Sequence, residues 1–255
     1  MRYVTINRTD RVGVNIYMRL ILINNCEKNK EELTYVHTPL FNETFEEMFN
    51  LGASYKNIKN IGNKISISSG GIDCDSLKDF NEPKNLPDFS ENFRLKMIKK
   101  LNKKYFNKQR SKNLNFCIHL RRGDTTRGTQ LKASKYLRFT DDSFLQRSLD
   151  TIKSRFNNCK TPPLINIHSD SEIDMEKFKT YNLNVNTKFH VKPEEAISDM
   201  ISCDCLFRYG ISSFSGVAAF YNQNYVISEQ PKAYEGMYKM DNVFKMKDFK
   251  KINFT

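Results

Sequence analysis

The sequence has no tryptophan, no Cys-x-x-Cys pair and no apolar run long enough to cross a membrane. Cys203 and Cys205, spaced Cys-x-Cys, have no nearby histidine pair with the spacing of a zinc site. Several cysteines lie in apolar segments, where a free thiol packs as a small core residue. We therefore predict a reducing compartment, with neither a disulfide framework nor a metal site. The six cysteines are Cys26, Cys74, Cys117, Cys159, Cys203 and Cys205.

The N-terminal region also lacks the features of a signal peptide. Its apolar run, Tyr17 to Ile23, is short, is interrupted by Arg19, and is not followed by a small-residue cleavage pattern. We expect a cytoplasmic protein without a signal peptide or a membrane anchor. A viral or bacterial protein that acts in the host or cell cytoplasm would fit these absences.

Dense basic blocks are absent as well, although the formal net charge is +12. A charge of this size suits nucleic acid, an anionic membrane surface or a phosphorylated small substrate. The lysines are spread through the chain among many asparagines, so solvated surface accounts for much of the excess. A basic nucleic-acid-binding protein remains an alternative. Against it, the aromatic residues recur at core spacing and no recognised nucleic-acid-binding module is present.

What the sequence does contain is a regular alternation of apolar strand and helix patterns, and 39% hydrophobic residues suffice for a core. Residues 81–90, with two prolines, form a predicted linker. The alternation predicts an α/β fold of two Rossmann-like β/α domains with a cleft between them, residues 1–106 and 107–255. The C-terminal tail could pack back on the N-terminal domain. The predicted strands are 3–6, 33–37, 64–68, 114–120, 164–168, 185–191, 205–209 and 225–228. The predicted helices are 14–25, 44–51 with Gly52 as C-cap, 90–106, 142–156, 172–181, 193–203 and 216–222.

Three predicted strands of the second half end in small, polar or charged residues. These ends are Arg121-Arg122-Gly123-Asp124, Ser169-Asp170-Ser171 and Ser212-Ser213-Phe214-Ser215. Because parallel strands present their carboxyl ends along one edge, the three ends could converge on one ligand. Two guanidinium groups can bind a phosphate or diphosphate bidentately. We therefore predict a nucleotide-sugar site at this edge.

The same segments resemble the motifs of a known family. Residues 119–124, His-Leu-Arg-Arg-Gly-Asp, resemble the H-x-R-R-G-D motif of the α1,2-, α1,6- and protein O-fucosyltransferase superfamily. Residues 168–171 and 199–219 resemble its second and third motifs, and residues 13–15, Gly-Val-Asn, its early Gly-Asn loop. The resemblance implies a GT-B-like fold with the acceptor side in the N-terminal domain and the nucleotide-sugar in the C-terminal domain. It also implies inverting transfer of L-fucose from GDP-fucose to a glycan or glycoprotein hydroxyl, without a metal or other cofactor.

The resemblance also assigns roles to residues. Arg121 would contact the β-phosphate and stabilise the leaving diphosphate, and Arg122 would share that work or brace the loop. Asp124 would orient the arginines. The donor-binding candidates are His119, Arg121, Asp124, Ser169, Asp170, Asp199, Ser212, Ser213, Ser215, Gly13 and Asn15.

Some features depart from the family pattern. The third motif lacks the tryptophans of α1,2-fucosyltransferases, and the early loop has one glycine where relatives carry more. UDP-xylose, GDP-mannose or a similar donor therefore remains an alternative to GDP-fucose. The general base is unassigned. Asp10, His37 and Glu43 are candidates because they follow N-terminal strands and would face the cleft.

Overall fold

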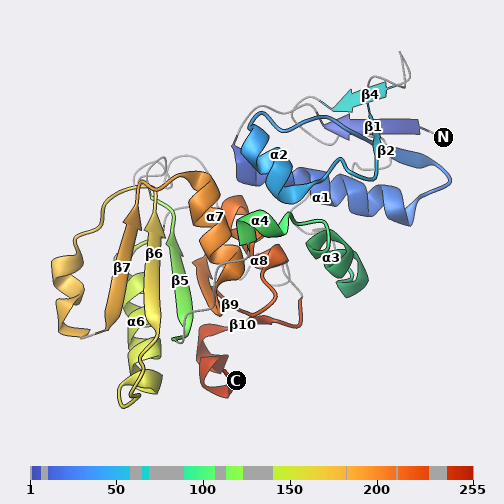
Figure 1. Ribbon diagram of the computed structural model, residues 1–255. Coiled ribbons are helices and arrows are strands. Elements are labelled where there is room, and N and C mark those ends of the chain that lie inside the picture. Colours follow the sequence, from blue (N-terminus) through green and yellow to red (C-terminus); the bar gives the residue numbers. More distant parts are fainter. Residues whose placement is uncertain are drawn as a thin grey trace. The chain divides into compact units, whose positions relative to one another are not determined.

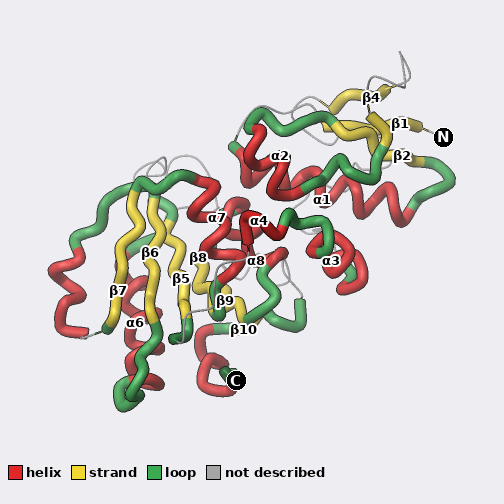
Figure 2. The backbone as a smooth tube through the Cα atoms, viewed as in Figure 1, coloured by secondary structure: helices red, strands yellow, loops and turns green. Residues whose placement is uncertain are grey.

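The computed structural model describes residues 2–6, 11–57, 65–68, 89–106, 113–122, 140–181, 183–210, 212–229 and 240–254. These residues form two compact units, one ending at Tyr105 and the other beginning at Phe106. Each unit contains a parallel sheet with helices packed against it (Figures 1 and 2). The α/β class predicted from the sequence is confirmed.

The N-terminal unit has a four-stranded sheet in the order β3-β2-β1-β4, with parallel registered pairs. Helix α1 packs against β1 and β2. The elements are β1 (Arg2–Ile6), α1 (Val12–Lys28), β2 (Leu33–His37), α2 (Glu43–Phe49), β3 (Lys56–Asn57), β4 (Ile65–Ser68), α3 (Glu91–Ile98) and α4 (Lys103–Phe106). The two-residue strand β3 was not predicted.

Helix α2 ends differently from the prediction. Asn42 caps its start by accepting the N–H of Phe45 at 3.2 Å, and Asn50 ends it in the left-handed conformation, at φ 48°. Gly52 is therefore not the C-cap. It lies against His37 instead, because a Cβ at position 52 would be 2.7 Å from the imidazole Cγ.

The single helix predicted over residues 90–106 is two helices. Ser90 caps α3 by accepting the N–H of Phe93 at 3.2 Å. Between α3 and α4, the side chain of Asn102 accepts the N–H of Lys104 at 3.1 Å, and its own N–H donates to the carbonyl of Met48. Asparagine thus supplies a local hydrogen bond that competes with a continuous helix.

The C-terminal unit has a six-stranded parallel sheet in the order β10-β9-β8-β5-β6-β7. From β5 the chain runs outward through β6 and β7, then returns to β8 on the other side of β5. The strand order therefore reverses between β5 and β8. The elements are β5 (Asn115–Leu120), α6 (Asp142–Phe156), β6 (Leu164–Ser169), the 3-10 helix η3 (Met175–Tyr181), β7 (Asn184–Phe189), α7 (Pro193–Ser202), β8 (Cys205–Tyr209), α8 (Ser213–Tyr221), β9 (Tyr225–Glu229), β10 (Val243–Phe244) and the 3-10 helix η5 (Met246–Lys251).

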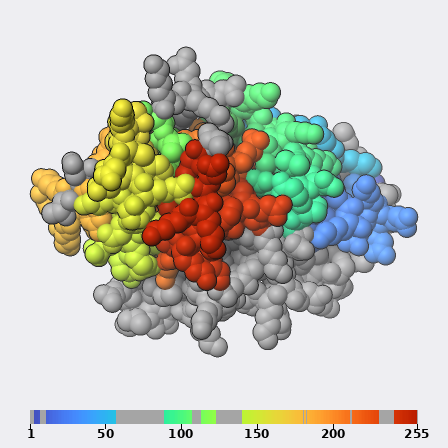
Figure 3. Space-filling view, turned by 90° about the horizontal axis from the view of Figure 1, so that it is seen from below, coloured from blue at the N-terminus to red at the C-terminus, as the bar shows by residue number. Residues whose placement is uncertain are grey.

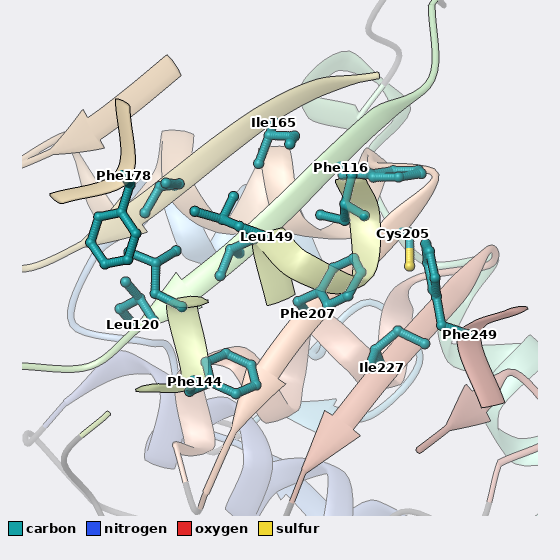
Figure 4. Close-up of a cluster of buried hydrophobic side chains, with 14 of the residues drawn as sticks. Phe116, Leu120, Phe144, Leu149, Ile165, Phe178, Cys205, Phe207, Ile227 and Phe249 are labelled. Carbon is teal, nitrogen blue, oxygen red and sulfur yellow. The ribbon is translucent and has the colours of Figure 1, made fainter. Parts of the chain in front are cut away.

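The core of this unit lies between the sheet and α6 (Figure 4). Phe116, Ile118 and Leu120 alternate along β5 and are fully buried against α6 side chains such as Phe144 and Leu149. The intervening residues of β5 point to the opposite face because side chains alternate along a strand. That opposite face is covered by α7 and α8, which pack on each other.

The C-terminal segment belongs to this second unit. Phe249 and Ile252 lie in the same core, and β10 pairs with β9. The guanidinium of Arg155 on α6 donates to the carbonyl of Phe249 at 2.5 Å and to that of Ile252. Figure 3 shows the red C-terminal segment against the yellow-green α6. Neither β10 nor η5 was predicted, and the described residues 240–254 belong to the second unit.

Candidate functional site

The three polar strand ends are neighbours in the structure. They follow β5, β6 and β8, which lie side by side in the sheet with β5 in the middle (Figure 2). Ligands of open α/β sheets bind outside the carboxyl ends of the strands, where the strand order reverses. In this unit that point lies between β5 and β8. We therefore take this edge as the candidate functional site.

One row of polar side chains crosses five strands just inside this edge. In register, the row consists of Lys188, His168, His119, Arg208 and Ser228, on β7, β6, β5, β8 and β9 in turn. Residues paired in register on parallel strands point to the same face of a sheet. The row therefore lies on the face covered by α7 and α8.

His119 is buried in the middle of this row, with 8% of its surface exposed. Its ring lies 6.0 Å from the ring of Phe214 on α8, and its Nδ1 has no hydrogen-bond partner among the described residues. Burial lowers its pKa to about 3, with further lowering by His168, Arg208 and Arg121. His119 is therefore a neutral imidazole at physiological pH and can offer a hydrogen bond but no charge.

The two adjacent arginines have different surroundings. The guanidinium of Arg122 lies 2.6 Å from the carboxylate of Asp142 at the start of α6, and its Nε donates to the carbonyl of Thr140 at 2.9 Å. Arg122 thus ties the end of β5 to α6. Arg121 is one residue closer to the strand, and its charge contributes to lowering the pKa of the His119 imidazole.

The end of β6 mainly stabilises its neighbours. The carboxylate of Asp170 accepts the backbone N–H of Arg122 at 2.7 Å, which joins the ends of β5 and β6. The hydroxyl of Ser169 is buried and accepts the N–H of Ser171 at 3.2 Å. Both side chains therefore have contacts that fix the loop.

Helix α8 begins at Ser213, three residues earlier than predicted. Ser212 is the N-cap, and its hydroxyl accepts the N–H of Ser215 at 3.5 Å. Ser215 is fully buried, and its hydroxyl donates to the carbonyl of Ser212 at 3.4 Å. Ser213 and Phe214 are half-buried. Of the three serines, only Ser213 therefore has a partly exposed hydroxyl at the start of the helix.

Asp199 on α7 is a buried carboxylate beside the row. Its Oδ2 lies 3.4 Å from Nε2 of His168 and 3.9 Å from Nζ of Lys188. Lys188 also lies 3.0 Å from a carboxylate oxygen of Glu195. His168, only 2% exposed, has no hydrogen bond at either ring nitrogen among the described residues. Asp199, His168, Lys188 and Glu195 therefore form one polar cluster beside α7.

Two of the N-terminal candidates, Gly13 and Asn15, lie in a helix rather than in a loop. Gly13 and Asn15 are buried in the first turns of α1, because that helix begins at Val12 rather than at Val14. The side-chain oxygen of Asn15 accepts a hydrogen bond from the buried guanidinium of Arg19 at 2.7 Å. Asn15 therefore holds the Arg19 guanidinium against α1, whereas Gly13 only lies within the helix. Asp10 and Asp124 lie outside the described residues.

His37 has both ring nitrogens engaged. Its Nε2 lies 2.6 Å from Oε1 of Glu46, and its Nδ1 lies 3.1 Å from the hydroxyl of Tyr35. The second carboxylate oxygen of Glu46 accepts the N–H of Leu40 at 2.8 Å. This chain of hydrogen bonds fixes the turn between β2 and α2. Glu43, at the start of α2, is exposed.

Sequence reasoning missed Arg208. This arginine is fully buried in β8, in register with His119, and donates hydrogen bonds to four oxygens around the start of α8. The sequence did contain a sign of this residue: an arginine within an otherwise apolar strand, in register with the histidine of β5. Glu46, which holds the His37 imidazole, was also missed.

The described part of the chain has neither a metal-binding cluster nor a membrane-spanning helix. No group of three or more His, Cys, Asp or Glu side chains there could bind a metal ion. No helix in the same residues has both the length and the apolar composition of a membrane span.

The sheet order and the site define an α/β fold of the GT-B-like class. Comparison with solved structures gives the same fold. The chain is similar to POFUT1 in complex with GDP, with a TM-score of 0.52 and 13% identity, covering 90% of this chain and 98% of that one. For POFUT1 in complex with GDP-fucose the TM-score is 0.51 and the identity 14%, covering 91% and 97%. The fucosyltransferase NodZ from Bradyrhizobium gives 0.47 and 16%, covering 86% and 91%. No family model and no curated protein sequence matches.

Proposed function

We propose that this protein is an inverting glycosyltransferase that moves L-fucose from GDP-fucose to a hydroxyl of a glycan or glycoprotein. Residues 107–255 would bind the donor, and residues 1–106 would form the acceptor side. The observation that carries the proposal is the position of Arg121. It follows the central strand, beside the point where the strand order reverses, in a fold that POFUT1 adopts in complex with GDP and with GDP-fucose.

Breaking the bond between the sugar and the diphosphate leaves negative charge on the β-phosphate. A guanidinium fixed near that phosphate stabilises the charge in the transition state, a task that other transferases give to a divalent ion. Arg121 would supply the cation and the neutral His119 a hydrogen bond. Ser213 and the first N–H groups of α8 would bind further phosphate or ribose oxygens.

The contacts of the other candidates decide the role of Arg122 and the choice of general base. Arg122 would brace the loop rather than bind the donor, because its guanidinium already contacts Asp142 and Thr140. The acceptor hydroxyl must lose a proton. Glu43 suits a general base better than His37, because the carboxylate is exposed whereas both imidazole nitrogens have partners. Asp10 remains a candidate base.

A thermal-shift panel of GDP, UDP, CMP and their sugar conjugates tests the donor. A ligand at about 100 times its Kd stabilises the native state by about 2.7 kcal/mol. We expect GDP and GDP-fucose to raise Tm. A shift with UDP alone would exclude the fucose donor but retain a transferase. Oligonucleotide binding without any nucleotide shift would favour the nucleic-acid-binding alternative.

Release of GDP from GDP-fucose tests the role of Arg121. Arg121→Ala should lower the rate of release by about 10²–10³ while the far-UV circular dichroism stays native. Arg147→Ala is the matched control, because Arg147 lies on the exposed side of α6 and pairs with Glu229 at 2.8 Å. Near-normal release by Arg121→Ala would refute the site assignment.

A further inference from the structure

Arg208 contributes a fully buried positive charge directly beneath the start of α8. Its Nη1 donates to the hydroxyl of Ser228 at 2.8 Å and its Nη2 to the carbonyl of Gly210 at 3.0 Å. Longer contacts, both 3.4 Å, join Nη2 to the carbonyl of Ser212 and Nε to the hydroxyl of Ser215. One planar guanidinium thus joins β9, the turn after β8 and the first turn of α8.

The turn that Arg208 contacts includes a glycine with a positive φ angle. Gly210 has φ 65°, a conformation that glycine adopts without steric cost, and its N–H donates to the carbonyl of Glu229 at 2.9 Å. Two residues later Ser212 caps α8. The position of Ser213 and the direction of the first helix N–H groups therefore depend on this turn.

Burying a guanidinium costs free energy unless hydrogen bonds replace its hydration. Oxygens of Gly210, Ser212, Ser215 and Ser228 accept the hydrogen bonds that replace this hydration. The charge itself also acts on the site, because Arg208 is one of the groups that lower the pKa of His119. The buried cation therefore lies at the edge where we place a diphosphate.

We propose that Arg208 is a positioning residue of the donor site. Its fork of donors fixes the turn between β8 and α8, so that Ser213 and the first N–H groups of α8 face the diphosphate contacted by Arg121. This inference rests on the proposed function, because it requires a nucleoside diphosphate at this edge.

Isothermal titration with GDP and the Tm of each variant together test the proposal. Arg208→Lys keeps the charge, but a point donor cannot reach acceptors on three elements at once. We expect its GDP affinity to fall by about tenfold or more. Arg155→Lys is the matched control, since Arg155 also donates to two backbone carbonyls of this unit but on the α6 side. It should lower Tm with GDP affinity unchanged.

Ser228→Ala covers the case in which Arg208→Lys does not fold. It removes one acceptor that orients the guanidinium while Arg208 itself is kept, so Arg208 should hold the turn less firmly and GDP affinity should fall by about three- to tenfold. The KM for GDP-fucose should rise in both variants more than kcat falls. The inference is overturned when both folded variants bind GDP within twofold of the wild type. Failure of the wild type to bind any nucleoside diphosphate would instead refute the proposed function.

Discussion

We expect the two adjacent arginines after β5 to have different roles: Arg121 acts on the donor and Arg122 stabilises the fold. Arg122 lies 2.6 Å from Asp142, with the two side chains 13% and 47% exposed. Charge-assisted hydrogen bonds contribute about 1.5–3 kcal/mol when buried, and exposed ion pairs about 0–1 kcal/mol. Because Asp142 is half-exposed, we expect Arg122→Met to lower the free energy of unfolding by about 1–2 kcal/mol.

Asp142→Asn breaks the same ion pair from the other side and serves as the control. It should lose a similar amount of stability, and the double variant should lose less than the sum of the two. Urea unfolding measures all three. Turnover of GDP-fucose should stay within about fivefold of the wild type in each, because the reacting phosphate is assigned to Arg121.

Arg121→Ala should show the opposite pattern. Its Tm should stay near that of the wild type, while turnover should fall by about 10²–10³, the usual cost of losing one group that stabilises transition-state charge. Arg121→Lys should recover little of this, because a point charge lacks the bidentate fork. A loss of turnover in Arg122→Met as large as in Arg121→Ala, beyond that in Asp142→Asn, would refute the division between the two arginines.

Three further predictions concern single side chains. Burial works to raise the pKa of Glu46, but hydrogen bonds from His37 and from the N–H of Leu40 lower it below the ordinary 4.5. As pH falls, the unfolded chain therefore takes up this proton at a higher pH than the folded chain does. The free energy of unfolding should then decrease as pH drops through and below about 4.5. Glu46→Gln should reduce that decrease in urea unfolding measured at pH 3 to 7. Gly52→Ala would force a Cβ to 2.7 Å from Cγ of His37, so urea unfolding should show a loss of about 1–3 kcal/mol, with no loss counting against this packing. Because burial and nearby positive charge lower the pKa of His119 to about 3, its imidazole NMR signals should not titrate between pH 5 and 8.

The sequence was sufficient for the alternation of strands and helices and for the convergence of three strand ends, because both depend on local patterns. The motif after β5 follows the central strand, in which residues 116–120 are all buried although His119 is polar. Contacts distant in sequence were not predictable. The hydrogen bonds from Arg155 to the tail join residues 94 and 97 positions apart, and the pairing of β10 with β9 has no local pattern in the sequence either.

Helix boundaries account for the larger errors at the site. Gly13, Ser213 and Ser215 were expected in loops because glycine and serine are turn residues. In the structure all three lie within helices, since α1 begins at Val12 and the Ser212 cap allows α8 to begin at Ser213. A serine can either bind a ligand or cap a helix, and only the three-dimensional contacts distinguish the two uses.

The alternation of side chains along a strand explains why a pair of arginines need not act as a pair. The direction that places Phe116, Ile118 and Leu120 against α6 also carries Arg122 toward Asp142 at the start of that helix. The opposite direction places His119 in the polar row, and the charge of Arg121 contributes to lowering the pKa of that histidine. A motif of two adjacent cations therefore supplies one group to each face of the sheet. Helix α6 covers one face of the sheet, and the capped start of α8 lies on the other. We therefore propose the catalytic role for Arg121 because of the face on which it acts, and not because it belongs to a pair of arginines.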